Sequence, residues 1–192
     1  MKYDYRYFGY VNKYYGITQD PVTKDFMIIR KYYGSDLKHY LTNVFYNIDW
    51  MGKLYKLTYI IIGLMNIHNT ETIHRDLHSG NILNYTDERD DNYYTIICDL
   101  GLSKSSTTST DDNDEIYGVI PYIAPEIFQG MKYTTASDIY SFGMIIWEFM
   151  TGRRPFWDRI HDIELIIEIC DGLRPPIVTN APQGYIKLMQ EC

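Results

Sequence analysis

Three oxygen-bearing side chains are placed where they could act together on a phosphate group. Asp76 and Asn81 lie five positions apart in the short polar stretch of residues 73–83, I-H-R-D-L-H-S-G-N-I-L. A strand-like run over residues 93–98 follows and leads directly into Asp99. Phosphoryl transfer needs a carboxylate to orient a hydroxyl nucleophile and hard oxygen ligands to hold magnesium. The residue types therefore predict a site for this chemistry at one edge of the fold.

The polar stretch needs a support on its N-terminal side, and the sequence supplies one. Apolar residues recur at gaps of three and four over residues 53–68, which is the spacing of one face of an α-helix. The members of this face are Leu54, Leu57, Ile61, Leu64 and His68. We expect an amphipathic helix that buries this face and from which the polar loop projects.

Further helices are expected towards the C-terminus. Residues 137–151, S-D-I-Y-S-F-G-M-I-I-W-E-F-M-T, are apolar on nearly all sides, which is typical of a central buried helix. Gly152 and then Pro155 indicate where this helix ends. Shorter helices are expected over 160–170 and over 185–192.

Three motifs in a fixed order carry a resemblance to a known family. Residues 74–81 read H-R-D-L-H-S-G-N, residues 99–101 read D-L-G, and residues 124–126 read A-P-E. Each triplet alone is common by chance. In this order and spacing, however, H-R-D-L-x-x-x-N, D-[F/L]-G and A-P-E are the signature set of the protein kinases. The chain resembles that family over essentially its whole length.

The resemblance implies an α+β fold of the protein kinase type. Residues 3–18 and 25–33 read as an antiparallel hairpin and would be the last strands of the small lobe. Residues 1–30 would then form the end of the small lobe and residues 31–36 the hinge. Residues 37–192 would form a mostly α-helical large lobe that lacks its last helix.

Two motifs of the family are missing from the sequence. It contains neither the G-x-G-x-x-G of the loop over the phosphates nor the V-A-I-K that carries the strand lysine. The resemblance therefore implies a kinase domain that is truncated at both ends. We expect the 192 residues alone to bind ATP weakly and to transfer phosphate poorly or not at all.

The implied reaction is transfer of the γ-phosphoryl group of ATP, bound with Mg²⁺, to a hydroxyl of a protein substrate in signal transduction. Asp76 would orient the hydroxyl and accept its proton, while Asn81 and Asp99 would hold magnesium. Val119 stands where serine/threonine kinases have a threonine, and the tryptophan that tyrosine kinases have near Tyr122 is absent. This combination fits the tyrosine-kinase-like branch, whose members mostly modify serine and threonine; tyrosine stays open as an acceptor.

The resemblance also suggests which residues contact the nucleotide. These are Lys31, Tyr32, Tyr33, Asp36, Leu83 and His78. Asp36 would bond to the ribose, although a role as N-cap of a helix that begins near Leu37 accounts for it equally well. Leu83 would lie beneath the adenine ring. His78 stands where serine/threonine kinases have a lysine for the γ-phosphate, and a largely neutral imidazole is a weaker partner for phosphate.

Residues 104–115, K-S-S-T-T-S-T-D-D-N-D-E, have the low complexity of a mobile loop and the position of an activation loop. The candidate phosphorylation sites in it are Thr107, Thr108, Ser109 and Thr110. A phosphate on one of them would pair with Arg75. A passive flexible loop is the alternative.

Four more residues are expected to have structural roles. His74 would pack beneath the D-L-G turn, with Leu100 stacked on it. Asp138 would accept hydrogen bonds from the backbone of the catalytic loop, or else would simply begin its helix. Glu126 would pair with an arginine that the family has beyond residue 192.

A binding or scaffold module is the alternative function, as a pseudokinase that kept the fold and lost catalysis or as an inactive gene fragment. The missing lysine and His78 favour it. Arg30 favours it too, because it stands where the family has a mid-sized apolar residue or threonine, and an arginine there costs desolvation unless it reaches an acid or solvent. The intact set of Asp76, Asn81 and Asp99 argues against it.

The composition excludes several other classes. A chain of 192 residues with 45% hydrophobic content suits one globular domain. The net charge of −7 and the pI of about 5.1 argue against nucleic-acid and anionic-membrane partners. Three widely spaced cysteines without C-x-x-C support neither a disulfide framework nor a zinc site. With no signal sequence and no membrane-spanning apolar run, a cytoplasmic location is expected, and the oligomeric state is not predicted.

Overall fold

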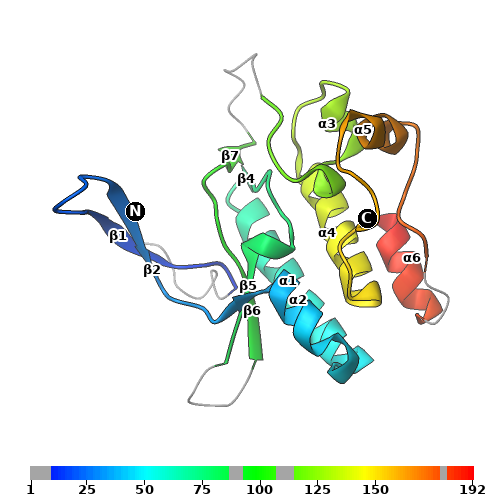
Figure 1. The fold of residues 1–192 in the computed structure, drawn as a ribbon, viewed down its shortest axis with the longest axis horizontal. Helices are drawn as coiled ribbons and strands as arrows, with labels where there is room; N and C mark the ends of the chain where they lie inside the picture. The colour runs from blue at the N-terminus through cyan, green and yellow to red at the C-terminus, as the bar shows by residue number, and fades with distance from the viewer. Residues whose placement is uncertain (1–9, 87–92, 107–114, 178–180) are drawn as a thin grey trace.

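The computed structural model of the chain describes residues 10–86, 93–106, 115–177 and 181–192. Helices and antiparallel strands are mixed along it, so the expected α+β class is confirmed (Figure 1). The strands are β1 (Tyr14–Gln19), β2 (Phe26–Arg30), β3 (Ser35–Asp36), β4 (Thr72–Ile73), β5 (Ile82–Thr86), β6 (Tyr93–Ile97) and β7 (Lys104–Ser105). The α-helices are α1 (Leu37–Val44), α2 (Trp50–His68), α3 (Pro125–Phe128), α4 (Thr135–Thr151), α5 (Ile163–Cys170) and α6 (Gln183–Glu191). Short 3-10 turns, η1 (Phe45–Asn47), η2 (Ser79–Asn81) and η3 (Ile120–Tyr122), complete the set.

Helix α4 is the centre of the helical body, as its all-round apolar sequence predicts. It contacts α2 on one side and α6 on another, and Ile145, Ile146 and Phe149 are fully buried in the main core. Its N-terminus is closed by a capping box in which Thr134 is the N-cap. Its C-terminus ends at Gly152, whose φ of 70° is in the left-handed region that glycine adopts at little cost. Both ends are therefore fixed by local sequence.

Helix α2 is also present where expected, and Leu57 and Leu64 of its predicted face are buried, but the prediction was wrong at one end of that face. Leu54, placed on that face, is 41% exposed, whereas Lys53 and Lys56 are buried. Each lysine lies over an aromatic ring: Lys53 Nζ is 3.9 Å from the centroid of Phe45, and Lys56 Nζ is 4.4 Å from that of Tyr40. The hydrocarbon stem of a lysine can cover apolar surface, and its ammonium group is attracted to the face of an aromatic ring. The buried face of α2 therefore includes these two lysines and is not the purely apolar face that the spacing predicts.

A small antiparallel sheet in the order β3-β5-β6 lies beside α2. The pairing places Asp36 opposite Leu83, and Leu83 in turn opposite Ile96. Strand β4 pairs with β7, with Ile73 opposite Lys104. The chain entering the polar loop is thus held beside the chain that follows Asp99.

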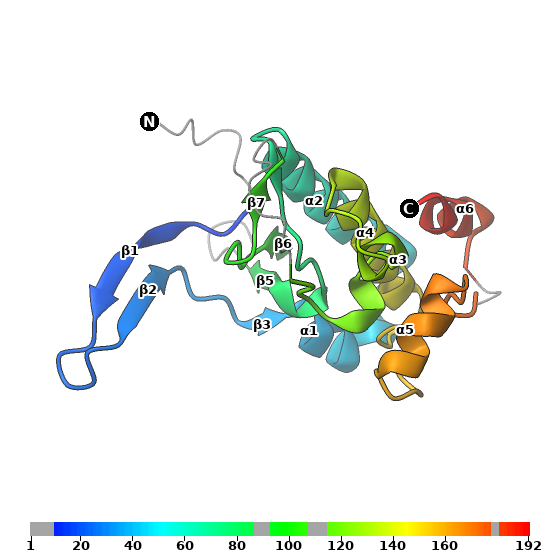
Figure 2. The same ribbon diagram turned by 90° about the horizontal axis from the view of Figure 1, so that it is seen from above.

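The hairpin β1–β2 extends away from the helical body (Figure 2). The expected strands over 3–18 and 25–33 are shorter in the structure, and residues 1–9 lie outside its described part. All eleven residues of β1 and β2 are exposed, including Ile17 and Phe26. The hairpin is therefore held mainly by its own ladder and by a few contacts with the body.

The remaining elements differ from expectation only at their ends. Helix α5 begins at Ile163 rather than at 160, because Asp162 caps it by accepting hydrogen bonds from the backbone of Glu164 and Leu165. Helix α6 begins at Gln183, directly after Pro182. None of the helices within the described ranges combines the length and the apolar content that a membrane crossing requires.

Candidate active site

The polar loop is fixed to helix α4 through one buried carboxylate. Asp138, of which 1% is exposed, accepts hydrogen bonds from the backbone N–H groups of His74 (2.8 Å) and Arg75 (3.0 Å). His68 Nε2, at the end of α2, lies 2.8 Å from the same carboxylate. Arg75 has a φ of 72°, a conformation that a non-glycine residue keeps only when its surroundings enforce it. The hydrogen bonds expected between Asp138 and the loop backbone are thus present.

His74 joins the loop to the residues before Asp99. Its Nε2 lies 3.1 Å from the carbonyl oxygen of Cys98, and its Nδ1 lies 3.3 Å from the backbone N–H of Asp76. The N–H can only donate, so Nδ1 accepts and Nε2 carries the proton that it donates to Cys98. Burial lowers the pKa of His74, in agreement with a neutral ring. His74 therefore fixes backbone positions, and both of its ring nitrogens are engaged in hydrogen bonds with the backbone.

Asn81 holds the carboxylate of Asp76 in place. Its Nδ2 donates to the backbone oxygen of Asp76 at 2.9 Å and to Oδ2 of the same residue at 3.1 Å. On the other side, His78 Nε2 lies 3.7 Å from Asp76 Oδ1. His78 Nδ1 accepts a hydrogen bond from the backbone of Gly80, so this ring also shapes the turn η2. Because the amide nitrogen of Asn81 is directed at Asp76, its Oδ1 points away and remains available to a ligand.

Asp99 lies in a tight turn at the edge of a cavity. Its φ is 62°, and its Oδ1 accepts a hydrogen bond from the backbone of Gly101 at 3.2 Å. Its own N–H donates to the hydroxyl of Tyr14 on the hairpin, at 3.2 Å. The adjacent cavity measures about 260 Å³ and is lined by Tyr14, Ile28, Arg30, Gly80, Asn81, Leu83, Cys98 and Asp99. Asn81, Leu83 and Asp99 are thus brought together, with Asp76 bonded to Asn81.

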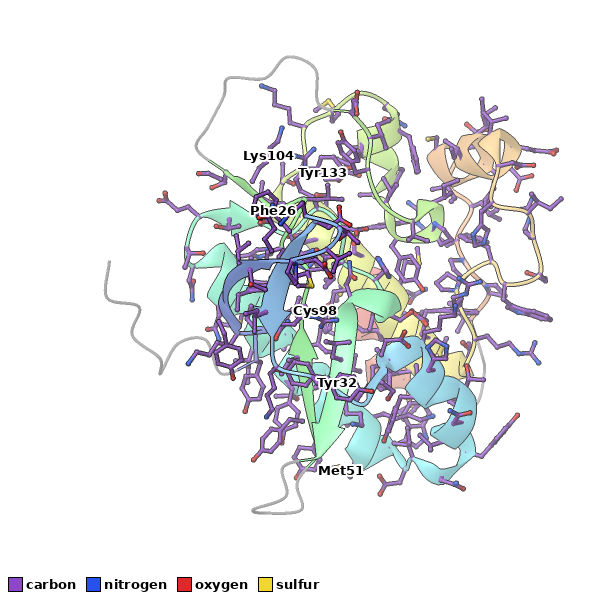
Figure 3. The ribbon with its side chains drawn as sticks, turned by 60° about the vertical axis from the view of Figure 1, so that its left-hand side comes forward. Phe26, Tyr32, Met51, Cys98, Lys104 and Tyr133 are labelled. Carbon is purple, nitrogen blue, oxygen red and sulfur yellow. The ribbon has the colours of Figure 1, made fainter. Side chains whose placement is uncertain are left out.

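The residues proposed for the hinge do not line this cavity. Tyr32 lies on the connection after β2 (Figure 3) and is 86% exposed. Lys31 Nζ lies 5.7 Å from the ring centroid of Tyr33. Tyr33 packs against the small cluster that contains Leu83. Asp36 caps helix α1 by accepting a hydrogen bond from the backbone of His39 at 2.7 Å, so the N-cap alternative is present in the structure.

Arg30 and His78 differ in how they relate to the cavity. Arg30 lines the cavity, but its side chain is exposed to solvent. Because the guanidinium stays in solvent, it avoids the desolvation cost expected for an arginine at this position. His78 is not part of the lining and faces Asp76 instead. Neither arrangement blocks the space beside Asn81 and Asp99.

The residues given regulatory or structural roles are placed as follows. The guanidinium of Arg75 lies 4.4 Å from the ring centroid of Tyr133, and Tyr133 donates a hydrogen bond to the carbonyl oxygen of Tyr117. Leu100 is half-buried against the main core, and Glu126 lies in the first turn of α3. The four candidate phosphorylation sites Thr107, Thr108, Ser109 and Thr110 lie outside the described residues.

Comparison with known proteins identifies the family. The sequence profile described as protein tyrosine and serine/threonine kinase matches residues 7–192. The chain belongs to the protein kinase family. Members of this family are ATP-dependent enzymes with the mixed helical and strand architecture described above.

Curated kinases are similar to the chain at modest identity. Stress-activated protein kinase alpha of Dictyostelium discoideum is 30% identical over 196 residues, which cover 95% of this chain and 30% of that protein. A protein of the same organism named as a probable serine/threonine-protein kinase is 36% identical over 143 residues, or 73% of this chain and 15% of that protein. Another, named probable serine/threonine-protein kinase roco5, is 33% identical over 169 residues, which cover 81% and 6%. The chain therefore spans less than a third of the length of these relatives.

One group of residues in this kinase was missed at the sequence level. The hydroxyl of Tyr122, in η3, donates to Glu148 Oε1 at 2.6 Å and lies 3.4 Å from the Ser79 hydroxyl in the catalytic loop. Glu148 is 2% exposed, and burial raises its pKa to about 7. The sequence did contain a signal for this contact: Glu148 is an acid within the apolar run of residues 137–151. A buried acid needs a hydrogen-bonding partner, so a partner could have been expected. The polar loop, η3 and α4 are thus joined through one buried polar group.

Proposed function

We propose that the protein transfers the γ-phosphoryl group of Mg-ATP to serine or threonine hydroxyls of a protein substrate. The observation that carries this proposal is that Asn81 and Asp99 line one cavity, while Asn81 also donates a hydrogen bond to the carboxylate of Asp76. The residues of the cavity fit the cofactors. Asn81 Oδ1 and the Asp99 carboxylate are hard oxygen ligands suited to Mg²⁺, and Leu83 offers an apolar surface to a base.

Asp76 is the residue that handles the substrate hydroxyl in this proposal. Its carboxylate, oriented by Asn81, would accept a hydrogen bond from the hydroxyl and take up its proton late in the reaction. A Cβ built on Gly118 would lie 3.2 Å from Cγ1 of Ile123 and 3.4 Å from Asp76 Oδ1, so the chain passes close to this carboxylate at a residue without a side chain. Bound magnesium supplies the charge that neutralises the phosphates. The remaining work of the protein is positioning.

The finer assignments are also part of the proposal. Residues 1–30 would be the end of a small lobe, 31–36 a hinge and 37–192 a large lobe of a kinase domain. Val119 supports membership of the tyrosine-kinase-like branch, and the names of the similar proteins support serine and threonine as acceptors. The contacts of Lys31, Tyr32, Tyr33 and Asp36 with nucleotide, and a cytoplasmic location, remain predictions.

A binding module without catalysis is the second candidate. Arg30 at the cavity and His78 beside Asp76 favour it, because neither is the residue that the family's reaction uses at its position. This candidate predicts that nucleotide or partner binding persists while phosphate transfer is independent of Asp76.

The deciding experiment is incorporation of radioactive phosphate from ATP into a mixed protein substrate by a form of the protein that includes a glycine-rich loop and a strand lysine, and by its Asp76→Asn variant. This form is used because the 192 residues alone are expected to transfer phosphate poorly or not at all. The substitution keeps the size of the side chain and its bond to Asn81 while it removes the proton acceptor. The proposal expects the rate of the variant to be lower by about 100-fold or more. Equal incorporation by both proteins would contradict it and would leave the binding module.

A further inference from the structure

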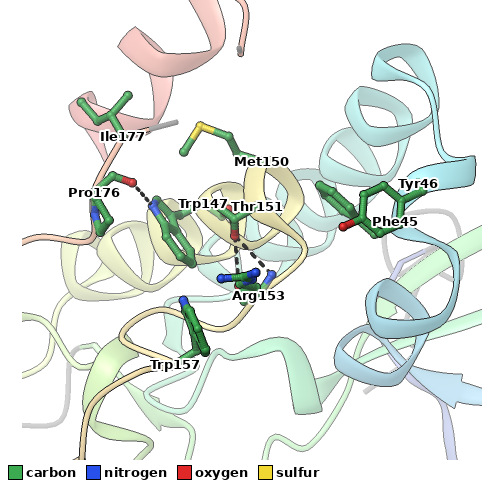
Figure 4. A pocket seen from close by; sticks show the side chains of 9 residues that line it. All are labelled: Phe45, Tyr46, Trp147, Met150, Thr151, Arg153, Trp157, Pro176 and Ile177. Atoms are coloured by element: carbon green, nitrogen blue, oxygen red, sulfur yellow. Dashed lines mark hydrogen bonds between the residues drawn. The ribbon is translucent and has the colours of Figure 1, made fainter. Parts of the chain in front are cut away.

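A second cavity lies where helix α4 ends. It measures about 310 Å³ and shares no lining residue with the cavity beside Asp99. Trp147 and Met150 line it from α4, Trp157 from the segment that follows, and Phe45 and Tyr46 from η1 (Figure 4). Four of these five side chains are aromatic. The cavity is thus a built apolar site outside the proposed reaction centre.

The walls of this cavity are held by specific contacts. A Cβ at Gly152 would lie 2.6 Å from Cγ of Phe45, so only a glycine allows the chain to turn this closely against that ring. Trp147 Nε1 donates to the backbone oxygen of Pro176 at 2.8 Å, and the Thr151 hydroxyl donates to the backbone oxygen of Trp147 at 3.0 Å (Figure 4). The shape is therefore present before any ligand binds, which reduces the ordering cost of binding.

The rim of the cavity is cationic and aromatic. Arg153 Cζ lies 4.2 Å from the ring centroid of Trp157, and among the described residues no carboxylate lies within ion-pair distance of Arg153. Residues 153–158 carry two arginines against one acid, although the whole chain has a net charge of −7. Trp157 is 54% exposed and Tyr46 is 96% exposed. Exposed tryptophan, tyrosine and arginine are the residue types that dominate binding energy at protein interfaces.

The cavity and the segment that passes Asp76 both depend on residues of helix α4. Trp147 precedes Glu148, whose carboxyl group holds Tyr122 in η3. The chain that enters η3 passes Gly118, which faces Asp76. One helix therefore supports both the cavity and the segment beside the proposed proton acceptor.

We propose that this cavity docks an acidic segment of the protein substrate that carries one large apolar side chain, away from the hydroxyl that is phosphorylated. The apolar side chain would enter between the aromatic walls, and the acidic residues would bind Arg153 at the rim. As an assignment of substrate class, this rests on the proposed function. Docking itself can be measured without catalysis.

The binding test uses an array of short fluorescent peptides in which one Phe, Leu or Trp stands among Asp and Glu, and a matched array in which Lys replaces the acids. Fluorescence anisotropy is measured with the purified protein and with Arg153→Glu and Trp157→Ala. Lys132→Glu and Met131→Ala serve as matched controls, because both residues are exposed elsewhere on the surface. Acidic peptides are expected to bind, and each rim variant to weaken binding about tenfold, while the controls leave it unchanged. Arg153→Glu is a surface change, so the test does not depend on Trp157→Ala folding.

The substrate test joins the best acidic peptide to a segment that contains the phosphoacceptor. The joined segment is expected to lower KM for the unchanged protein by about tenfold, with kcat unchanged, and to have no effect on KM for Arg153→Glu. Equal binding of acidic and lysine peptides, or equal binding by the rim variants, would overturn docking. If phosphate transfer depends on Asp76 but acidic peptides do not bind, the docking proposal is contradicted and the proposed function is not. Acidic-peptide binding with transfer independent of Asp76 would defeat the proposed function and with it the assignment to a substrate.

Discussion

At the scale of single residues, the proposed function gives Asn81 two separate tasks. Its amide nitrogen orients Asp76, and its Oδ1 is left free to bind a cation. A residue with both tasks can be tested by variants that remove one task or both. Asp76 and Asn81 lie close in sequence, which is why their association could be predicted from spacing alone.

Asn81→Asp and Asn81→Ala should therefore differ. The aspartate keeps an oxygen ligand but loses the donor to Asp76 and brings a second charge next to it, while alanine loses ligand and donor together. Alanine should lower kcat/KM by about 100-fold or more, and aspartate should retain measurable magnesium-dependent transfer. Steady-state rates over a magnesium titration measure this. Identical magnesium dependence in the two variants would contradict the ligand role of Asn81.

Glu148 gives a second prediction at the residue scale, on pH. Burial raises the pKa of Glu148 to about 7 from its ordinary value of 4.5. Between these two values the folded protein binds more protons than the unfolded chain, so the free energy of unfolding falls as pH rises. A fall of roughly 3 kcal/mol is expected over this window. Urea unfolding of the protein and of Glu148→Gln at several pH values measures it.

The comparison with Glu148→Gln isolates this carboxyl group from others. His74, whose pKa burial lowers, produces a slope of the opposite sign in both proteins. The difference in free energy of unfolding between the protein and Glu148→Gln should therefore change with pH only through the ionisation of Glu148. A difference that stays flat between about pH 4.5 and 7 would show that Glu148 is ionised without cost.

At the scale of elements, what could be predicted depends on how local its cause is. The limits of α4 follow from Thr134, Gly152 and an apolar run, so they were predictable. The burial of Lys53 depends on Phe45, a ring contributed by another element, and periodicity of apolar residues contains no such information. The bond between Tyr122 and Glu148 joins residues 26 positions apart and was missed for the same reason.

The end of α4 gives a prediction on stability. Gly152→Ala combines an unfavourable positive φ with a Cβ 2.6 Å from the Phe45 ring, whereas Gly172→Ala has a positive φ of 103° and no atom within 4 Å. Gly152→Ala should therefore destabilise the protein by about 2–4 kcal/mol and Gly172→Ala by about 1 kcal/mol. Chemical denaturation of both variants measures the difference. Equal losses would mean that the close approach of Phe45 has no energetic weight.

At the scale of the whole molecule, the site is shared between a well-packed helical body and an exposed hairpin. Asn81, Leu83 and Asp99 belong to the body, while Tyr14, Ile28 and Arg30 of the same cavity belong to β1 and β2. Tyr14 connects the two parts by accepting the hydrogen bond of the Asp99 backbone. The motifs predicted the body side of the cavity, but its hairpin side depends on packing that no local pattern records.

The measurement that tests the central claim most directly is a calorimetric titration of ATP into the purified protein and into Asp99→Asn, each with and without magnesium. If Asn81 and Asp99 form one cation site beside the nucleotide, magnesium should strengthen ATP binding to the unchanged protein, and Asp99→Asn should remove most of that gain, by about tenfold or more in Kd. Equal ATP affinity in all four titrations would contradict the account.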